Sequence, residues 1–269
     1  MAFLSRFSLA GKVSLVTGAS RGIGKSTALA FAEAGASVAL ASRKQQDLDN
    51  VAEEIRSAGG EAFPVAAHTG RLDEIRSLVD RATGRYGRID ILVNNAGGAP
   101  ATALCLDAEE RLWDTVMNLN LKGVYFLSRS VANVMREQGG GKIINVASTS
   151  GFKPEYRNGI YSIAKSAVPM LTKSMALELA QFNIRVNAVA PGAVMTRALA
   201  YNWSSLPGDQ AKLVQSAIAG GAAMNRIAGP DEIAGAMLYL ASDASSFTTG
   251  ETIVVDGGLL VGNSHFGPS

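Results

Sequence analysis

The sequence predicts a single α/β domain over residues 1–269, built on one doubly wound, parallel, seven-stranded sheet with helices on both faces. Short β-branched apolar runs alternate with helical patterns along most of the chain, which is typical of βαβ units. Runs such as Ile91-Leu92-Val93 are apolar without interruption, as expected of strands that are covered on both faces. No linker, repeat or low-complexity tract divides the sequence, so we expect one domain.

The strands and helices follow from these patterns in chain order. Seven runs have the length and composition of strands, at residues 13–17, 37–41, 62–66, 89–94, 142–147, 184–189 and 252–255. Helical patterns lie between them, at residues 23–34, 45–57, 73–86, 108–137, 161–181 and 231–242. Pro169 lies inside the fifth helix, where it removes a backbone N–H donor, so we expect a local kink there.

Residues 193–229 form a longer connection than is usual in a compact domain. Extra length at such a point is often functional, and we expect a small helical substrate lid. A peripheral helical hairpin is the alternative interpretation.

Composition argues against several classes of partner. The 25 Lys and Arg side chains nearly balance the 23 Asp and Glu side chains, so electrostatic binding of nucleic acid or of an anionic membrane has no support. No apolar run approaches the ~20 residues of a membrane span. Residues 1–9 are interrupted by Arg6, which leaves too little room for a signal peptide. We therefore expect a cytoplasmic protein.

Cysteine and histidine are scarce. Cys105 is the single cysteine, which excludes an internal disulfide, and the two histidines, His68 and His265, make a metal site of His and Cys ligands improbable. We expect a reducing compartment and no metal.

A glycine-rich turn follows the first predicted strand and opens the first predicted helix. Its glycines permit positive φ and let backbone N–H groups approach a pyrophosphate at the positive helix terminus. Such a turn can also be only a tight connection, but its place in the first βα unit favours a dinucleotide. The candidate contacts are Gly18, Ser20, Arg21, Gly22, Ile23 and Gly24.

The end of the second strand usually distinguishes NAD from NADP. A carboxylate there binds the ribose 2′-OH, whereas arginine accommodates a 2′-phosphate. This chain has Ser42 and Arg43 at that point and no acid until Asp47, and Arg21 could add a second cation. NADP(H) is therefore favoured over NAD(H).

Tyr161 and Lys165 lie four residues apart, so a helix places a phenol beside an ammonium group. An adjacent cation favours the phenolate and lowers the pKa of a tyrosine, which makes Tyr161 a candidate general acid/base. An ordinary solvated helix face gives the same spacing, so the other motifs decide between the two.

From about residue 9 to residue 258 the chain resembles the classical short-chain dehydrogenase/reductase family, whose sheet is of the Rossmann type. The resemblance is carried by motifs in order: the loop at 17–24, Asn94-Asn95-Ala96-Gly97, Asn120-Leu121-Lys122-Gly123, Ser148, Tyr161-x-x-x-Lys165 and Pro191-Gly192.

The resemblance implies a catalytic tetrad of Asn120, Ser148, Tyr161 and Lys165. Tyr161 would donate a proton to the carbonyl oxygen or take it back from the alcohol, while Ser148 orients that oxygen. Lys165 would lower the pKa of Tyr161 and hold the nicotinamide ribose. Asn120 would hold a water that links Lys165 to solvent. Thr149 and Ser150 also carry hydroxyl groups and could play the same role, but the spacing of the family motif favours Ser148.

The resemblance also implies further cofactor contacts and an assembly. The first half of the motif at residues 94–97 would line the cofactor crevice, and the second half would do so or form a structural turn. Thr196 matches the residue that hydrogen-bonds the nicotinamide carboxamide. A homotetramer is the family default. The contacts implied here are Asn95, Ala96, Gly97, Tyr161, Lys165, Pro191, Gly192, Val194 and Thr196.

His68 departs from the family pattern, which usually has an aspartate that accepts a hydrogen bond from the adenine amino group. Neutral imidazole could accept one bond through its bare nitrogen or stack on the base. A surface histidine in a loop is the alternative. A subset of NADP-dependent carbonyl reductases in the family resembles the chain here and at residues 42–44, which favours a reductase.

We therefore expect an NADP(H)-dependent oxidoreductase that interconverts a secondary alcohol and a ketone. A 3-oxoacyl-[acyl-carrier-protein] reductase shares every motif and is the alternative, and a cofactor-sensing or scaffold protein is the non-enzyme alternative. The pocket rim is expected from residues 99–104, 150–157 and the long segment with Met195, Tyr201 and Trp203. Lys153, Arg157 and Arg197 on this rim could bind an anionic substrate, or they could be solvated or face the cofactor.

Overall fold

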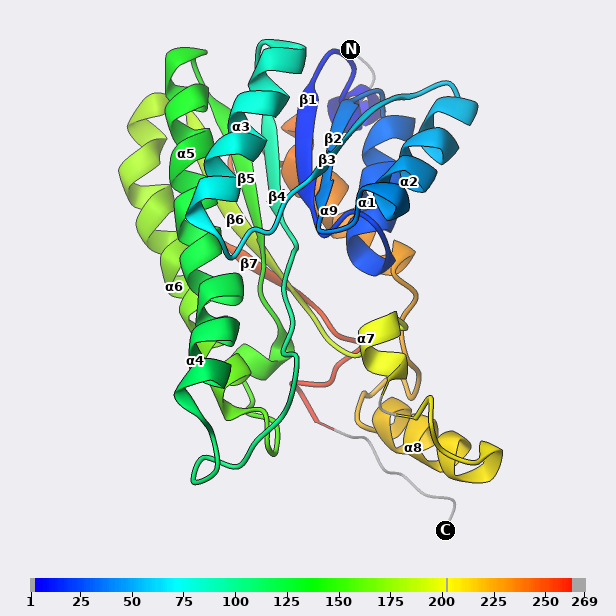
Figure 1. Ribbon diagram of the computed structural model, residues 1–269. Coiled ribbons are helices and arrows are strands. Elements are labelled where there is room, and N and C mark those ends of the chain that lie inside the picture. Colours follow the sequence, from blue (N-terminus) through cyan, green and yellow to red (C-terminus); the bar gives the residue numbers. More distant parts are fainter. Residues whose placement is uncertain (1–2, 202, 263–269) are drawn as a thin grey trace.

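A computed structural model describes residues 3–201 and 203–262, and its centre is a seven-stranded parallel sheet (Figure 1). The strand order is β3-β2-β1-β4-β5-β6-β7. The strands are β1 Val13–Thr17, β2 Ser37–Ser42, β3 Glu61–Ala66, β4 Ile91–Asn94, β5 Gly141–Val146, β6 Ile184–Pro191 and β7 Thr252–Val255. The predicted fold class is confirmed, and every predicted strand exists within two residues of its expected bounds.

The strand order reverses at β1. Leu15 of β1 pairs with Ala39 of β2 on one side and with Leu92 of β4 on the other. The connections that leave β1 and β4 therefore turn away from each other to opposite faces of the sheet, which opens a crevice at the carboxyl ends of these strands. The fold thus positions a ligand site there.

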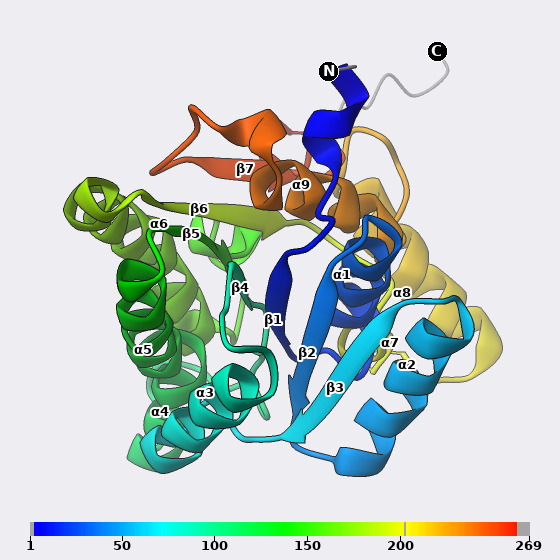
Figure 2. The same ribbon diagram turned by 90° about the horizontal axis from the view of Figure 1, so that it is seen from above.

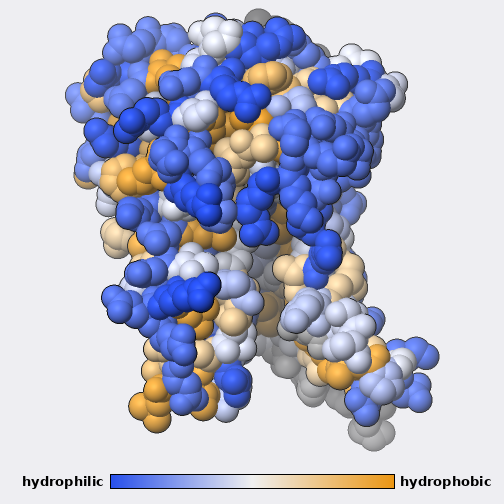
Figure 3. Space-filling view, viewed as in Figure 1, coloured by the Kyte–Doolittle hydropathy of each residue, from blue (hydrophilic) through white to orange (hydrophobic). Residues whose placement is uncertain are grey.

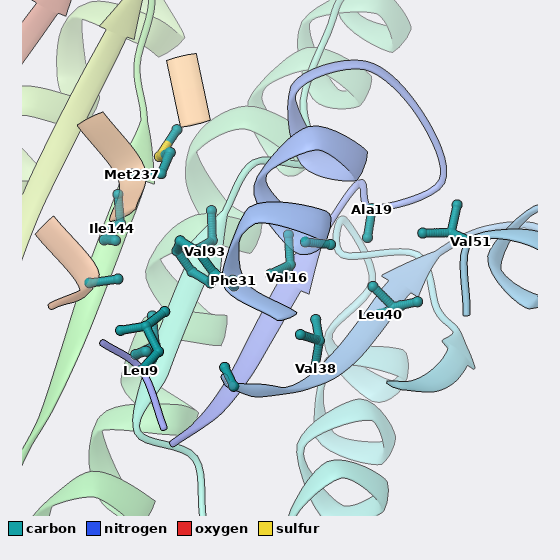
Figure 4. Packing of buried hydrophobic residues seen from close by; sticks show 14 of the residues in the cluster. Leu9, Val16, Ala19, Phe31, Val38, Leu40, Val51, Val93, Ile144 and Met237 are labelled. Carbon is teal, nitrogen blue, oxygen red and sulfur yellow. The ribbon is translucent and has the colours of Figure 1, made fainter. Parts of the chain in front are cut away.

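Two sets of helices cover the two faces of the sheet (Figure 2). One face carries α1 Gly22–Glu33, α2 Gln45–Ser57 and α9 Asp231–Ala241, and the other carries α3 Leu72–Tyr86, α5 Gly123–Glu137 and α6 Gly159–Leu179. Figure 4 shows Phe31 of α1 packed over the strand residues Val16 and Val93, with Met237 of α9 nearby. Phe31 is fully buried, so the sheet supports α1 and the turn before it from below.

The predicted helix at 108–137 is wrong in one respect, because it is divided. The chain forms α4 Glu110–Met117, then a π-helical turn over Asn118–Lys122, and then α5. A Cβ on Gly123 would meet the carbonyl oxygen of Thr69, so the chain packs there against the loop after β3. π-Helical turns occur frequently at functional sites, and this one contains Asn120.

Helix α6 continues through Pro169 from Gly159 to Leu179 and is followed by a 3₁₀ turn at Ala180–Phe182. Proline has no N–H to donate to the carbonyl of Lys165. That carbonyl faces Gly151 instead, since a Cβ on Gly151 would lie 2.6 Å from it. The helix is not interrupted at the proline, and its backbone at Lys165 is packed against a neighbouring turn.

Residues 193–229 form a projection with two helices, α7 Arg197–Ala200 and α8 Gly208–Gly220. Its base is closed by two hydrogen bonds, from Met195 N to Ala228 O (2.8 Å) and from Ala228 N to Ala193 O (3.0 Å). In Figure 3 a cleft separates this projection from the lobe that carries α4 and the loops around it. Both interpretations predicted helices here, and the lid stays a prediction.

Candidate active site

The four residues of the predicted tetrad lie together at the carboxyl ends of β4 and β5. Tyr161 and Lys165 come from the first turns of α6, and the Lys165 Nζ atom lies 5.7 Å from the centroid of the Tyr161 ring. Ser148 follows β5 and hydrogen-bonds to Tyr161. A Cβ on Gly97 would lie 2.8 Å from Asn120 Oδ1 and 3.2 Å from Lys165 Nζ, so Asn120 and Lys165 flank the same glycine.

Ser148 is held by the short 3₁₀ turn that follows it, Thr149–Gly151. Its hydroxyl caps this turn by accepting a hydrogen bond from Ser150 N (3.1 Å). The turn packs on α6, because Gly151 has no space for a side chain beside the Lys165 carbonyl. The rivals at 149 and 150 are buried, whereas Ser148 is half-buried beside Tyr161. This geometry favours Ser148 as the serine that reaches a substrate.

The pKa of Tyr161 is raised from its ordinary value of 10.0 to about 12. Burial of the phenol is the main cause, and the carboxylate of Glu155 raises it further, while the hydrogen bond with Ser148 acts in the opposite direction. The net shift is opposite to the lowering expected from Lys165. The phenol is therefore a protonated donor at neutral pH, ready to act as an acid.

Lys165 is almost completely buried, with 3% of its surface exposed. Its Nζ donates a hydrogen bond to the Val146 carbonyl (2.6 Å) at the end of β5. Burial disfavours the ammonium form and lowers the pKa of Lys165 from 10.5 to about 8. The amine is thus easily deprotonated for a lysine, and its position is fixed by the sheet.

The side chain of Asn120 joins the π-helical turn to the loop after β4. Its Nδ2 donates to the carbonyls of Gly98 and Val116 (2.8 Å each), and its Oδ1 accepts from Gly98 N (2.9 Å). Both ends of the amide are bonded to backbone, so the side chain braces the loop beside Lys165. Its expected role in holding a water stays a prediction.

The glycine turn before α1 has the shape that a pyrophosphate requires. Gly18 and Gly22 have φ values of 65° and 54°, in the left-handed region that favours glycine. A Cβ on Gly24 would meet the Gly18 carbonyl, and one on Gly18 would lie 2.6 Å from Asn95 Nδ2. Helix α1 has no side-chain cap at Arg21. The turn therefore presents backbone N–H groups that no side chain caps at a helix N-terminus. These residues fit a dinucleotide phosphate.

The loop after β4 supports this turn. The backbone N–H groups of Asn95 and Ala96 both donate to Thr17 Oγ1 (3.0 Å each), and Asn95 Nδ2 donates to Thr17 O (2.8 Å). Asn95 therefore contacts the glycine turn directly, while the adjacent Gly97 contacts Asn120 and Lys165. The motif connects the predicted cofactor turn to the tetrad. Ser20 and Ile23 of the same turn are half-buried.

Two arginines lie where a 2′-phosphate is expected. Arg43 follows Ser42 at the end of β2, and Arg21 precedes α1; both side chains are exposed. Lys25, by contrast, is paired with Glu54 at 2.6 Å. The exposed guanidinium groups are accessible to an anion at the edge of the crevice.

His68 lies in the loop after β3, and its ring is tied to that loop. Its Nδ1 accepts a hydrogen bond from Gly70 N (3.0 Å), and its backbone N–H donates to Glu74 Oε2 (2.7 Å). This backbone bond is the main reason why the pKa of Glu74 is lowered. A neutral imidazole with Nδ1 as acceptor carries its proton on Nε2, so His68 can donate to a base or stack on it. The ring nitrogen that was expected to accept a hydrogen bond from the adenine amino group, Nδ1, already accepts one from Gly70 N within the loop.

The segment after β6 approaches the glycine turn. A Cβ on Gly22 would lie 3.1 Å from Thr196 Cγ2, so two segments that the sequence assigned to the cofactor are adjacent. Gly192 N donates to Val255 O (3.0 Å), which fixes the turn after Pro191 against β7. Val194, which follows this turn in the chain, is buried.

A small pocket opens beside Tyr161, and its lining is mostly apolar. Arg157 on its rim has a φ of 62°, unusual for a residue other than glycine, and its carbonyl accepts a hydrogen bond from Ala103 N (2.9 Å). Lys153, Met195 and Tyr201 are exposed as expected, but Trp203 is buried and does not form a rim. The lining is Ala99, Ala101, Ala103, Leu112, Val116, Arg157, Asn158, Ile160 and Tyr161.

Two residues near the tetrad, Glu155 and Asn158, were not singled out from the sequence. Glu155 accepts a hydrogen bond from Ser150 Oγ at 2.5 Å and another from Asn158 Nδ2 at 3.0 Å. Both lie in the irregular loop before α6, where no periodicity indicates which side chains meet. Their position between Ser148 and Tyr161 along the chain was the one available signal.

Comparison with known proteins identifies the family. A family model described as enoyl-(acyl carrier protein) reductase matches residues 18–260. A 3-oxoacyl-[acyl-carrier-protein] reductase of Thermotoga maritima is 40% identical over 94% of this chain and 99% of its own. The chain belongs to the short-chain dehydrogenase/reductase family. It is accordingly an oxidoreductase of the class that acts on CH–OH and keto groups.

Two solved structures of the family resemble the chain closely. L-sorbose reductase from Gluconobacter frateurii, complexed with NADPH and L-sorbose, has a TM-score of 0.90 at 31% identity and covers 95% of this chain and 98% of its own. A 7α-hydroxysteroid dehydrogenase complexed with NADH and a 7-oxo bile acid has a TM-score of 0.87 at 33% identity and covers 99% of this chain and 100% of its own. The family thus uses both nicotinamide cofactors.

Two further observations concern the described residues. Among residues 3–201 and 203–262, no group of three or more His, Cys, Asp or Glu side chains could hold a metal ion; His265 lies outside these residues. In the same part of the chain, no helix has the length and apolar character needed to cross a bilayer.

Proposed function

We propose that the protein is an NADP(H)-dependent oxidoreductase that interconverts a secondary alcohol and a ketone. The observation that carries the proposal is the grouping of Tyr161, Ser148 and Lys165 within one crevice, beside a glycine turn that can hold a dinucleotide. The nicotinamide supplies or takes the hydride when it is bound. The residues of this chain then handle the proton.

In ketone reduction, Tyr161 donates its proton to the carbonyl oxygen as negative charge develops there. The raised pKa of Tyr161, about 12, keeps that proton on the phenol at neutral pH. Ser148 donates a hydrogen bond to the same oxygen and orients it. Lys165 supplies a cation beside the phenolate that forms, and Asn120 holds the neighbouring loop in place. In alcohol oxidation the phenolate takes the hydroxyl proton.

The preference for NADP(H) rests on Arg21 and Arg43. Both guanidinium groups are exposed at the crevice edge, and Ser42 stands where an NAD-binding protein usually has a carboxylate. The NADPH complex of the sorbose reductase supports this preference, whereas the NADH complex of the hydroxysteroid dehydrogenase shows that the family allows the other cofactor.

The direct test is a panel of alcohols (2-butanol, cyclohexanol, 1-phenylethanol and sugar alcohols) and the matching ketones, assayed with NADP(H) and with NAD(H). We expect turnover of at least one pair, with the higher kcat/KM for NADP(H). Tyr161→Phe keeps the shape of the ring and removes the proton, so it should abolish turnover. Full turnover in this variant would contradict the mechanism and favour a protein in which the fold serves binding alone.

A 3-oxoacyl-[acyl-carrier-protein] reductase is the second candidate. Arg157 lines the pocket and Lys153 is exposed in the same loop before α6, where both could meet an acidic carrier, and the Thermotoga maritima relative has this name. Acetoacetyl thioesters as substrates separate the two candidates. Reduction of the thioester far faster than of the simple ketones, together with its loss in Arg157→Ala, would favour the carrier-protein reductase.

The family resemblance also supports a homotetramer in the cytoplasm. Large apolar side chains on α6 face solvent in the single chain, among them Ile163, Met170 and Leu177. Apolar surface of this kind is typical of a subunit interface. Light scattering after size-exclusion chromatography tests the assembly, and a monomeric mass would contradict it.

A further inference from the structure

The pocket beside Tyr161 has walls made mostly of short apolar side chains. Three segments of the chain form it: the loop after β4, helix α4 and the loop before α6. Leu112 and Val116 come from α4, and Val116 is only 1% exposed, so one wall of the pocket belongs to the protein interior. The loop after β4 contributes alternate residues, and all of them are alanines: Ala99, Ala101 and Ala103.

Hydrogen bonds hold these walls at a fixed separation. Ala103 N donates to Arg157 O at 2.9 Å, and Ala103 pairs with Asn158 as an isolated parallel bridge, so the two loops are joined. Arg157 has a φ of 62°, which an arginine keeps only where its surroundings impose it. On the side of α4, the Val116 carbonyl accepts from Asn120 Nδ2 at 2.8 Å. The pocket therefore cannot widen without the loss of these contacts.

The free space in the pocket is small. It amounts to about 10 Å³, which is the space that one water-sized group needs. A methyl group is close to this size, whereas each further methylene has to displace a wall. Closely packed walls resist such a displacement, because one added methylene already forces side chains out of their preferred rotamers. The pocket thus has the dimensions of a methyl group.

The surroundings of Tyr161 differ in size on the two sides of a bound carbonyl group. A ketone that accepts the Tyr161 proton carries one substituent on each side of its C=O bond. The small pocket borders Tyr161 on one side. On the other, an open cleft separates the lobe of α4 from the projection at 193–229 (Figure 3). A small and a large substituent are therefore accommodated in different places.

We propose that the substrates are methyl ketones and the matching secondary alcohols, with the methyl group in this pocket and the larger group in the cleft. The inference rests on the proposed function and names its substrate class. It applies to both candidate activities, because an acetoacetyl thioester also carries a methyl group on its reacting carbonyl. Since the two substituents cannot exchange places, hydride reaches one face of the carbonyl, and the product is a single enantiomer.

The first test varies the group that enters the pocket and keeps the rest of the substrate constant. Acetophenone, propiophenone and butyrophenone carry a methyl, ethyl or propyl group, and the acetoacetyl, 3-oxopentanoyl and 3-oxohexanoyl thioesters form the parallel series. We expect kcat/KM to fall about tenfold from methyl to ethyl and again from ethyl to propyl, as is usual for one methylene in an apolar pocket. Chiral chromatography should find one enantiomer of the methyl product. The series with the faster turnover is used for the variants.

Two variants change the pocket itself. Leu112→Ala removes most of a side chain from the α4 wall, so kcat/KM for the propyl substrate relative to the methyl substrate should rise about tenfold. Ala103→Val narrows the pocket with a β-branched side chain that suits the bridged backbone, so kcat/KM for the methyl substrate should fall about tenfold. Leu106→Ala is the matched control, because Leu106 is 96% exposed on the same loop and does not line the pocket. It should leave every ratio unchanged.

The ratios do not depend on how much protein is folded, because both substrates are assayed on one preparation. The inference is overturned if the wild type uses the propyl substrate as well as the methyl substrate, or if Leu112→Ala keeps the wild-type ratio. Turnover of cyclohexanone or of sugar ketones without turnover of any methyl ketone would overturn it while the proposed function stands. Absence of turnover with every carbonyl compound would contradict the proposed function, and the inference with it.

Discussion

Lys165→Met should stabilise the apoprotein while it abolishes activity. The ammonium group is buried and has a pKa lowered from 10.5 to about 8. This shift corresponds to about 3 kcal/mol of destabilisation at neutral pH, since one pKa unit is worth about 1.4 kcal/mol. Methionine has a similar length and no charge. It also leaves the Val146 carbonyl without its donor, which costs about 1 kcal/mol. The expected net gain is about 2 kcal/mol.

The gain in the free energy of unfolding of Lys165→Met over the wild type should become smaller as pH rises. The folded state has the lower pKa, so unfolding takes up a proton between about pH 8 and pH 10.5, and the wild type becomes more stable as pH rises through this window. The penalty of the buried charge is fully present below about pH 8. The advantage of Lys165→Met should therefore shrink by about 2 kcal/mol between about pH 7 and about pH 9.5.

Urea denaturation at these two pH values measures both effects, and thermal unfolding should show a rise in Tm of about 4 to 8 °C at neutral pH. Lys173→Met is the matched control, because Lys173 is exposed on the same helix and should change stability by no more than about 0.5 kcal/mol. The reasoning is refuted if Lys165→Met is less stable than the wild type at neutral pH, or if its advantage is the same at both pH values.

The remaining predictions concern the helix, the serine turn, the cofactor and the acid/base. Pro169→Ala restores a helical donor and should stabilise the fold by about 1 to 3 kcal/mol; an unchanged or lower Tm with intact activity would contradict this. Gly151→Ala forces a Cβ to within 2.6 Å of a backbone carbonyl, and should lower Tm and kcat together, whereas Gly84→Ala, in open space on α3, should not. Arg43→Ala should weaken NADPH binding about tenfold by fluorescence titration, through loss of a charge-assisted bond, and leave NADH unaffected; equal losses would argue against a 2′-phosphate site. With the pKa of Tyr161 near 12, the phenolate fraction rises about tenfold per pH unit, so kcat/KM for oxidation should increase from about pH 6 to pH 9, and a flat profile would exclude this ionisation as limiting.

The fold was predictable because its main signals are local. Apolar strands flanked by helical patterns placed all seven strands, and the bounds of β1 and β7 were predicted without error. The division between α4 and α5 was missed because the π-helical turn contains neither proline nor glycine. It depends on how closely Gly123 approaches Thr69, which is a contact between distant parts of the chain.

The parts of the candidate site that belong to short sequence motifs were predictable. The order of motifs predicted four residues that the structure brings together, and glycines marked the turn that needs positive φ. The direction of the pKa shift of Tyr161 was missed, because burial outweighs a nearby cation and burial is a property of the folded chain. The contact between Ser150 and Glu155 was missed for a related reason, since side-chain directions in an irregular loop are set by packing.

The two hydrogen bonds at the base of the 193–229 projection have a consequence for how this enzyme can diversify. They join Ala228 to Ala193 and Met195, so α7 and α8 are enclosed in a loop that leaves the sheet and returns to the same point. A change of sequence within the loop alters one wall of the cleft in Figure 3 and leaves β6 and its pairing with β7 intact. We therefore expect that the sequence of the projection, and with it the proposed selectivity for a substrate, can change without loss of the strand pairing that stabilises the sheet.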